Sequence, residues 1–416
     1  MLLHLQSAFG ICVIIALAWV LSEDRRAFPW RTVAAGLALQ AALAVLLLEV
    51  PAARSGLLVL NGAIDALTQA TKTGSSFVFG FVGGGSPPFA VTNPAGMVSF
   101  AFQILPLVLV ISALSALFWH WRILQFVVHA IAMALRKLMN IGGAVGLGSA
   151  ATVFLGMVEA PLLIRPYLSR LTRGELFMLM TVGLASVAGT VFFLYASILR
   201  DVVPGALGHI LIASMMSLPA AILIARIMIP GEPGVATERA SDLKYRSSMD
   251  AVARGTEDGL RIYLQILAML LVMVALVALA DTILRNLPWV WGSPLSLERI
   301  LGWLFAPLAW LFGVPWGEAA TAGSLMGTKT ILNELIAYLN LASLPPRALD
   351  PRATLIMIYA MCGFANPGSV GIMIAGMSTL APERRDEIVP LALRAIISGT
   401  MASGLTGAMV GLLPVI

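Results

Sequence analysis

Charge is the scarcest property of this sequence, since Lys, Arg, Asp and Glu make up only 11% of its 416 residues. A soluble globular chain carries about 25% charged residues, whereas 59% of this chain is hydrophobic. The composition therefore excludes one soluble core and predicts an all-α polytopic membrane protein. The net charge of +5 indicates no nucleic-acid partner, because the basic residues are confined to short polar breaks.

Cysteine and histidine are also scarce, with two and four residues. Cys12 and Cys362 lie far apart in apolar runs, so we expect neither a disulfide framework nor a metal site built from them. No H-E-x-x-H or G-x-S-x-G pattern occurs, and GSLMGTKT (323–330) lacks the spacing of a phosphate loop. We therefore expect no enzymatic chemistry and no cofactor. Residues 1–21 lack a basic start and a cleavage site, which predicts a first spanning helix and not a removable signal.

Eight apolar segments are long enough to cross a bilayer. They cover residues 2–21, 32–50, 99–119, 175–198, 206–229, 262–284, 352–378 and 388–414. Segments 54–72, 120–139 and 293–312 are expected to be amphipathic helices at the membrane interface. The polar stretch 230–261 is expected to be a cytoplasmic loop that connects two halves of the chain.

Two further apolar stretches, 143–168 and 314–342, are broken by glycines, and each carries an acid. Two half-length helices folded back on each other fit each stretch better than one straight span. Such backbone needs cover from protein or from a water-filled cavity. If both hairpins re-enter on the side they left, one face collects 18 of the 26 Lys and Arg residues. Because cytoplasmic loops are rich in these residues, the distribution predicts two oppositely oriented re-entrant hairpins and outside termini.

The two halves of the chain also form a weak internal repeat. GLASVAG (183–189) follows Glu159, and GFANPGS (363–369) follows Glu334, by about one span in each half. Paired glycine or proline breaks are typical of transporters with inverted repeats, because broken helices expose backbone groups to a solute or ion at mid-membrane.

Glu159 and Glu334 are the strongest functional candidates, because ionisable side chains inside a membrane are costly and functional by default. Either carboxylate can accept hydrogen bonds from a polar solute or carry a coupling proton. The alternative is a structural role in which Arg165 pairs with Glu159, or Lys329 with Glu334.

Five stretches together resemble the concentrative nucleoside transporter family, in its bacterial eight-span type. They are TGSSFVFGFVGG (73–84), ILPLVLVISALSAL (104–117), EAPLLIRPYL (159–168), GVPWGEAATAGSLMGTKTILNELIAYLNL (313–341) and CGFANPGSVGIMIAGM (362–377). The resemblance implies eight transmembrane helices, two inverted re-entrant hairpins, a scaffold, a mobile transport domain and a homotrimer. It also implies import of nucleosides across the inner membrane, driven by a sodium or proton gradient through an elevator-like movement.

Four segments follow from this layout. Residues 1–139 hold the N-terminal spans and interfacial helices and are expected to be mostly scaffold. Residues 140–229 hold the first hairpin, a broken span and the following span. Residues 230–312 hold the cytoplasmic loop, a scaffold span and an interfacial helix. Residues 313–416 hold the second hairpin, a broken span and the last span.

The resemblance also assigns a solute site residue by residue. It places the sugar-binding acid and amide at Glu334 and Asn366, in a site lined further by Val191, Phe364 and Ser369. The family usually presents Gly-Gln-Thr-Glu to the nucleobase, and the matching residues here are Gly156, Met157, Val158 and Glu159. Two hydrogen-bonding partners of the base are thus replaced by apolar side chains. A modified nucleoside or another base-like or sugar-like solute is therefore the alternative substrate.

A sodium site in this family maps to Thr152, Leu155, Ser186 and Val187. Thr152 stands where the family typically has asparagine, so one amide oxygen is replaced by a hydroxyl that can still ligate a hard cation. Sodium and proton coupling both remain open from the sequence.

Overall fold

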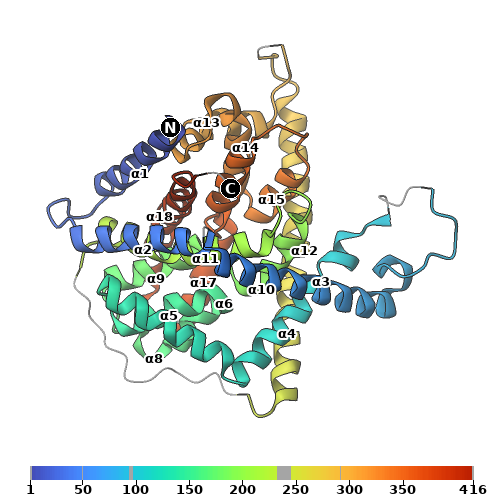
Figure 1. The fold of residues 1–416 in the computed structure, drawn as a ribbon, viewed down its shortest axis with the longest axis horizontal. Helices are drawn as coiled ribbons and strands as arrows, with labels where there is room; N and C mark the ends of the chain where they lie inside the picture. Colours follow the sequence, from blue (N-terminus) through green and yellow to red (C-terminus); the bar gives the residue numbers. More distant parts are fainter. Residues whose placement is uncertain (1, 49, 93–96, 232–244, 291, 415–416) are drawn as a thin grey trace.

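The computed structural model describes residues 2–48, 50–92, 97–231, 245–290 and 292–414, and every regular element in these ranges is helical. The elements are α1 (Leu2–Val20), α2 (Trp30–Leu48), α3 (Pro51–Phe79), η1 (Gly80–Gly83), η3 (Phe100–Ile104), α4 (Leu107–His120), α5 (Ile123–Met139), α6 (Gly143–Leu155), α7 (Glu159–Leu163), α8 (Arg165–Leu168), α9 (Arg173–Ala185), α10 (Gly189–Ile198), α11 (Ala206–Met228), α12 (Ser248–Leu284), α13 (Leu297–Phe312), α14 (Trp316–Ile331), α15 (Glu334–Ala342), α16 (Pro351–Met361), α17 (Pro367–Leu380), η4 (Pro382–Arg384) and α18 (Arg385–Val410) (Figure 1).

The helices occur where the sequence predicts membrane segments, which confirms the all-α polytopic class. Within the described ranges, seven helical segments are long and apolar enough to cross a membrane. The remaining predicted span, 352–378, is divided between α16 and α17, each shorter than a bilayer is thick. Only internally hydrogen-bonded backbone is stable in hydrocarbon, which is why these apolar runs form helices.

One prediction about the long polar loop is wrong in its second half. Residues 232–244 lie outside the described ranges, but α12 already begins at Ser248. The hydroxyl of Ser247 accepts a hydrogen bond from the backbone N–H of Asp250, and Arg254 pairs with Asp250 one turn later. A capped first turn and charge pairs at i,i+4 spacing stabilise a helix in this polar stretch. The helix therefore extends well beyond the apolar run 262–284.

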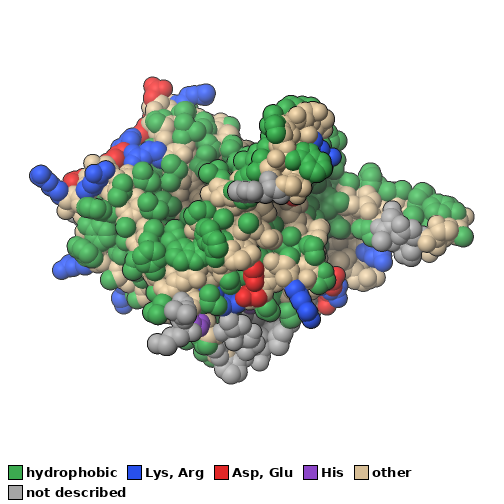
Figure 2. Space-filling view, turned by 90° about the horizontal axis from the view of Figure 1, so that it is seen from above, with side chains coloured by type: hydrophobic (Ala, Val, Ile, Leu, Met, Phe, Trp, Pro, Cys, Tyr) green, Lys and Arg blue, Asp and Glu red, His purple; other side chains and the backbone are tan. Residues whose placement is uncertain are grey.

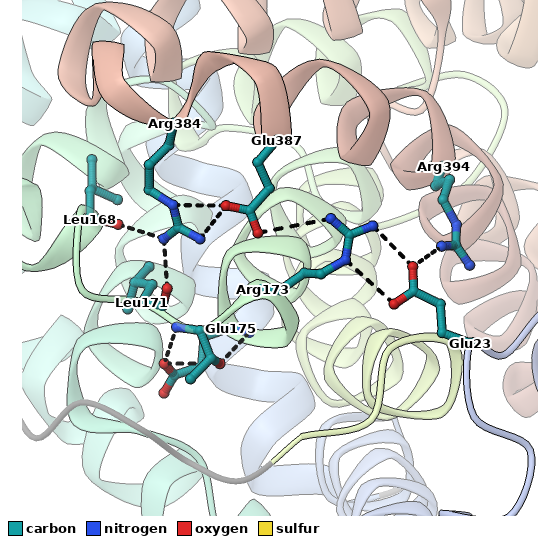
Figure 3. A network of polar contacts seen from close by, with 9 residues as sticks. Glu23, Leu168, Leu171, Arg173, Glu175, Arg384, Glu387 and Arg394 are labelled. Atoms are coloured by element: carbon teal, nitrogen blue, oxygen red, sulfur yellow. Dashed lines mark hydrogen bonds and ion pairs between the residues drawn. The ribbon is translucent and has the colours of Figure 1, made fainter.

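A network of charged residues joins several helices at one end of the bundle (Figure 3). The carboxylate of Glu23, in the loop between α1 and α2, accepts hydrogen bonds from Arg173 at the start of α9 and from Arg394 in α18. Arg384 pairs with Glu387 and also donates to two backbone carbonyls at the end of the first hairpin. These loops belong to the face that the sequence predicts to be basic.

A buried arginine joins helices at the other end. The guanidinium of Arg352, at the start of α16, donates to the carbonyls of Gly313 and Gly411, both at 2.6 Å, and to the hydroxyl of Ser7 at 3.0 Å. Gly313 and Gly411 follow the C-termini of α13 and α18, whose carbonyls carry partial negative charge. The charge of Arg352 is thus offset by helix ends, and α1, α13, α16 and α18 meet at one place.

Contacts between helices link most of the bundle. α1 and α2 pack against α11 and α18, which also contact α9 and α16. α4 packs against the N-terminal part of α12, where Gly255 and Gly259 approach Ser112, and it also contacts α5 and α10. Within residues 1–139, α2 contacts α3 and α5, and α4 also contacts both of these helices. Figure 1 shows α12 running along one side of the molecule.

The C-terminal end of α3 and the segment after it project from this body as a side arm, defined here as residues 73–92 and 97–104 (Figure 1). Five of its six phenylalanines are exposed, with Phe77 at 90%, and they form the ring pairs Phe79–Phe102 and Phe81–Phe89. The sixth, Phe100, is partly buried against the core. Seen from above, the arm carries hydrophobic side chains well outside the main body (Figure 2).

Candidate functional site

The first hairpin turns at Gly156, where α6 ends. Gly156 has φ +103°, a conformation that side chains rarely adopt, and a Cβ there would lie 3.0 Å from Oε2 of Glu159. The chain then begins α7 at Glu159, so this acid lies at the tip of the hairpin. α6 and α7 pack against each other, as the sequence predicts for a folded-back pair.

The second hairpin turns between α14 and α15. Asn333 caps α15, since its side-chain oxygen accepts a hydrogen bond from the backbone N–H of Ile336 at 2.9 Å. Glu334 is therefore the first residue of α15, where the helix dipole favours a carboxylate. Both predicted hairpin acids thus begin the second helix of their hairpin.

The two broken spans cross each other at their breaks. α9 ends at Ala185, α10 starts at Gly189, and the break between α16 and α17 covers residues 362–366. A Cβ on Gly363 would lie 2.8 Å from the carbonyl oxygen of Ala185, so only glycine allows this approach. Asn366 then caps α17 by accepting a hydrogen bond from the N–H of Ser369 at 2.9 Å.

Glu334 is the centre of a small polar cluster. Its Oε1 accepts a hydrogen bond of 2.7 Å from the Tyr195 hydroxyl, and its Oε2 accepts one of 3.2 Å from Nδ2 of Asn366. Lys329 is fully buried, but its Nζ donates to the hydroxyl of Ser403 at 3.4 Å and forms no ion pair with Glu334. Neither Glu334 nor Glu159 is paired with a lysine or arginine in the described part of the chain. The alternative of fixed ion pairs is therefore not what the structure shows.

Both acids face one cavity of about 200 Å³. Its lining includes every residue that the sequence assigns to the solute site, namely Gly156, Met157, Val158, Glu159, Val191, Glu334, Phe364, Asn366 and Ser369. Hairpin tips and helix breaks that are up to about 200 residues apart in the chain thus meet around one space.

The cavity also has lining residues that the sequence interpretation missed. Tyr195 lies one turn after Val191 in α10, a spacing that would have placed it on the same face. Thr190 and Asn333 contribute further polar groups, and Gln265 lines the cavity from α12. Gln265 was visible as the single polar residue in the apolar run 262–280, but nothing in the sequence indicated that α12 reaches the site.

The apolar tip of the first hairpin is held by close packing. A Cβ on Gly376, in α17, would lie 2.9 Å from Cγ1 of Val158, and one on Gly183, in α9, would lie 3.0 Å from Cβ of Met157. These glycines let the tip approach both broken spans closely. Met157 and Val158 therefore stabilise the hairpin tip by packing, and they offer no hydrogen bond to a solute.

The four residues of the predicted ion site lie at the C-terminal ends of α6 and α9 and just after them. The hydroxyl groups of Thr152 and Ser186 each donate to a carbonyl one turn back, both at 2.8 Å, so their lone pairs stay free to accept a cation. Leu155 ends α6, and the carbonyl of Val187 accepts a hydrogen bond from Ser214 at 3.2 Å. Hydroxyl and carbonyl oxygens beside two helix C-termini suit a hard monovalent cation.

Paired hairpins, two helix breaks in contact and a shared cavity that two acids and an amide line are the features of a membrane transporter. Three family descriptions match the chain, namely the N-terminus of Na+ dependent nucleoside transporters over residues 9–82, "Gate: Nucleoside recognition" over 101–201, and the C-terminus of Na+ dependent nucleoside transporters over 209–411. The chain belongs to the concentrative nucleoside transporter family.

Individual relatives agree with this assignment over almost their whole length. An uncharacterized transporter of Bacillus subtilis is 38% identical over 98% of this chain and 99% of its own. The nucleoside permease NupC of Helicobacter pylori is 34% identical over 98% of this chain and 97% of its own. A solved structure of CNTnw in an inward-facing, substrate-bound state has a TM-score of 0.88 at 35% identity, over 99% of this chain and 97% of that one.

Proposed function

We propose that this protein imports nucleosides in symport with a cation by an elevator-like movement. The observation that carries the proposal is the cluster of Glu334, Asn366 and Tyr195 on the wall of the cavity. A carboxylate and a carboxamide held side by side offer the acceptors and donors that neighbouring sugar hydroxyls require. The naming of the Helicobacter pylori relative as a nucleoside permease supports the same solute class.

Within the cavity, Glu334 and Asn366 bind the sugar, with Ser369 beside them. Phe364 offers a ring face for stacking on the base, and Val191 with the tip residues Gly156, Met157 and Val158 completes the apolar wall. Glu159 is the acidic group at the base end. Because Met157 and Val158 form no hydrogen bonds with a base, a modified nucleoside or another base-like or sugar-like solute is the second candidate.

Uptake into vesicles of the purified protein tests the function. Proteoliposomes should accumulate a labelled nucleoside above its outside concentration only when a cation gradient is imposed, and Glu334→Ala should abolish this uptake. Failure of uridine, cytidine, adenosine, guanosine and inosine all to bind or be taken up would contradict a nucleoside importer. The same vesicles then serve for other base-like solutes.

The coupling cation is sodium or a proton. Thr152, Leu155, Ser186 and Val187 supply oxygen ligands for sodium, and the family description supports this ion. Glu159 favours the proton, because it faces the cavity without a fixed cation beside it.

Uptake under a sodium-only gradient and under a proton-only gradient decides between the two ions. If sodium binds at this site, Ser186→Ala should raise the sodium concentration that gives half-maximal uptake about tenfold. It should leave the pH dependence of uptake unchanged. Uptake that ignores sodium and collapses without a proton gradient would establish proton coupling.

The proposed movement divides the helices as they pack. α4 and α12 form the stationary scaffold, and the two re-entrant hairpins move together with the broken spans and with α11 and α18. Residues 1–139 are proposed to be mostly scaffold, and α1 and α2 contact the moving body through α11 and α18. Each unit of positive charge that moves inward lowers the free energy by about 2.3 kcal/mol per 100 mV of membrane potential.

We further propose that the protein is a homotrimer in the inner membrane. The exposed phenylalanines of the side arm and the outward apolar face of α12 support contacts with lipid and with neighbouring protomers. Mass measurement of the protein in detergent or in lipid nanodiscs tests the trimer, and a monomeric mass in both would contradict it.

A further inference from the structure

One wall of the cavity is a single face of α12. Five of its residues line the cavity at intervals of three, one, three and one, namely Ile262, Gln265, Ile266, Met269 and Leu270. This spacing places all five side chains on the same side of an α-helix. The wall reaches the start of α17, because a Cβ on Gly368 would lie 3.4 Å from Cε of Met269.

Gln265 is the one polar member of this face, and its carboxamide has no hydrogen-bond partner within the described residues. Gln6, Gln40, Gln103 and Gln125 each donate to a protein acceptor, although Oε1 of Gln40 is buried without a partner. Gln40 donates to the carbonyl of Met216 and to the hydroxyl of Thr406, and Gln103 donates to two backbone carbonyls. A carboxamide in an apolar helix is costly unless it meets water or a ligand. The cavity is the place where Gln265 can meet either one.

The polar groups of the cavity are distributed unevenly. Glu334, Asn366 and Tyr195 form one cluster that satisfies sugar hydroxyls. Away from it, the walls are largely aliphatic or aromatic, and an ionised Glu159 can only accept hydrogen bonds. A nucleobase needs apolar cover for its faces and a few polar groups at its edge. Gln265 supplies a donor and an acceptor side by side, which matches base edges that carry an exocyclic group next to a ring nitrogen.

We propose that Gln265 is a specificity-determining residue that hydrogen-bonds the edge of the nucleobase. This role rests on the proposed nucleoside function. The carboxamide donates to a ring nitrogen or carbonyl of the base and accepts from the neighbouring N–H or amino group. The carboxamide can rotate by half a turn, which exchanges its oxygen and nitrogen. Gln265 can therefore bind bases with an amino group and bases with a carbonyl group, and it disfavours bases that lack the exocyclic group.

Pairs of nucleosides that differ only in this group test the proposal. Affinities of adenosine and purine riboside, and of cytidine and its analogue without the amino group, are measured by competition on the purified protein. The wild type should prefer the complete base by about threefold to tenfold in at least one pair, which corresponds to one neutral hydrogen bond. Gln265→Met, of similar size, should bring that ratio to within about twofold, since the missing bond is the same one.

Leu264→Ala is the matched control, because Leu264 is exposed on α12 and does not line the cavity. It should leave every ratio unchanged. A ratio that persists in Gln265→Met, an equal change in Leu264→Ala, or a wild type that does not distinguish either pair would overturn the role of Gln265 while nucleoside binding stands. A wild type that binds no nucleoside would instead overturn the proposed function, and the role with it.

Discussion

At the scale of single residues, the site depends on how Glu334 is held. Its two oxygens accept from groups on two other helices, α10 and the break before α17, so the carboxylate plane is set before a solute arrives. Hydrogen bonds to a charged group are stronger than neutral ones, at about 1.5–3 kcal/mol. The sequence identified Glu334 and Asn366, and the fold added Tyr195 as the group that orients the acid.

Tyr195→Phe tests this orientation. Removing the hydroxyl should weaken nucleoside affinity about tenfold, because Glu334 loses a charge-assisted hydrogen bond and can rotate away from the solute. Tyr338→Phe is the control, since the Tyr338 ring lies 5.1 Å from that of Tyr195 and its hydroxyl donates to the carbonyl of Ile358 instead. The control should lower the melting temperature and leave affinity unchanged. Equal affinities for Tyr195→Phe and the wild type would show that Tyr195 does not position Glu334.

At the scale of elements, the hairpins and broken helices are formed by local chemistry at their turns. Asn333 and Asn366 cap the helices that begin at the tip of the second hairpin and at the second break. Gly156 and Gly363 remove side chains where the backbone turns or where two breaks cross. Gly156, Asn333 and Asn366 line the cavity, and Gly363 directly precedes Phe364, which also lines it, so the residues that end the helices also shape the cavity.

Gly156→Ala should therefore disturb the cavity more than it disturbs the helices on either side of it. The left-handed φ and the 3.0 Å approach to Glu159 should together cost about 1–2 kcal/mol and displace the carboxylate, which would reduce uptake at least fivefold. Gly371→Ala in α17 is the comparison, because no atom lies within 4 Å of the added Cβ. It should keep wild-type uptake and gain up to about 1 kcal/mol in stability. Uptake rates and melting temperatures are measured for both variants side by side. If Gly156→Ala behaved like Gly371→Ala, the backbone turn at Gly156 would not be what shapes the cavity.

At the scale of the whole molecule, charged networks join helices that are distant in sequence. Arg173 donates to the carboxylate of Glu23 and, together with the charge of Arg394, holds its pKa below the ordinary value. A lowered pKa in the folded state means that Glu23 contributes stability above its unfolded pKa and loses that contribution as the pH falls through the folded value. The side chains are partly exposed, so the network is worth at most about 1 kcal/mol.

Glu23→Gln should accordingly lower the melting temperature at about pH 7.5, and its difference from the wild type should shrink at about pH 3, because the contribution of Glu23 is lost as the pH falls through its lowered pKa. Glu383→Gln, on the exposed turn η4, removes a carboxylate without an ion pair in the described ranges and should have no effect at either pH. A melting-temperature difference between Glu23→Gln and the wild type that is the same at both pH values would show that the charge of Glu23 is not what stabilises this end.

The amino-acid sequence by itself determined the class, most of the helices and many of the residues that line the cavity. Apolar runs of membrane length must form helices, and acids or helix breaks inside them must face something polar, so Glu159, Glu334 and Asn366 could be identified without coordinates. The sequence misplaced the start of α12, because a capped and charge-paired helix resembles a polar loop in composition.

Only the tertiary structure decided which distant residues meet. Lys329 is five positions from Glu334, yet it bonds to Ser403 of α18, while Tyr195 of α10 reaches the acid. Gln265 lines the cavity because α12 presents one face to it, and no local pattern encodes that approach. Helix formation is governed by neighbours along the chain, whereas contacts between helices depend on how whole faces pack, which is a property of the folded molecule.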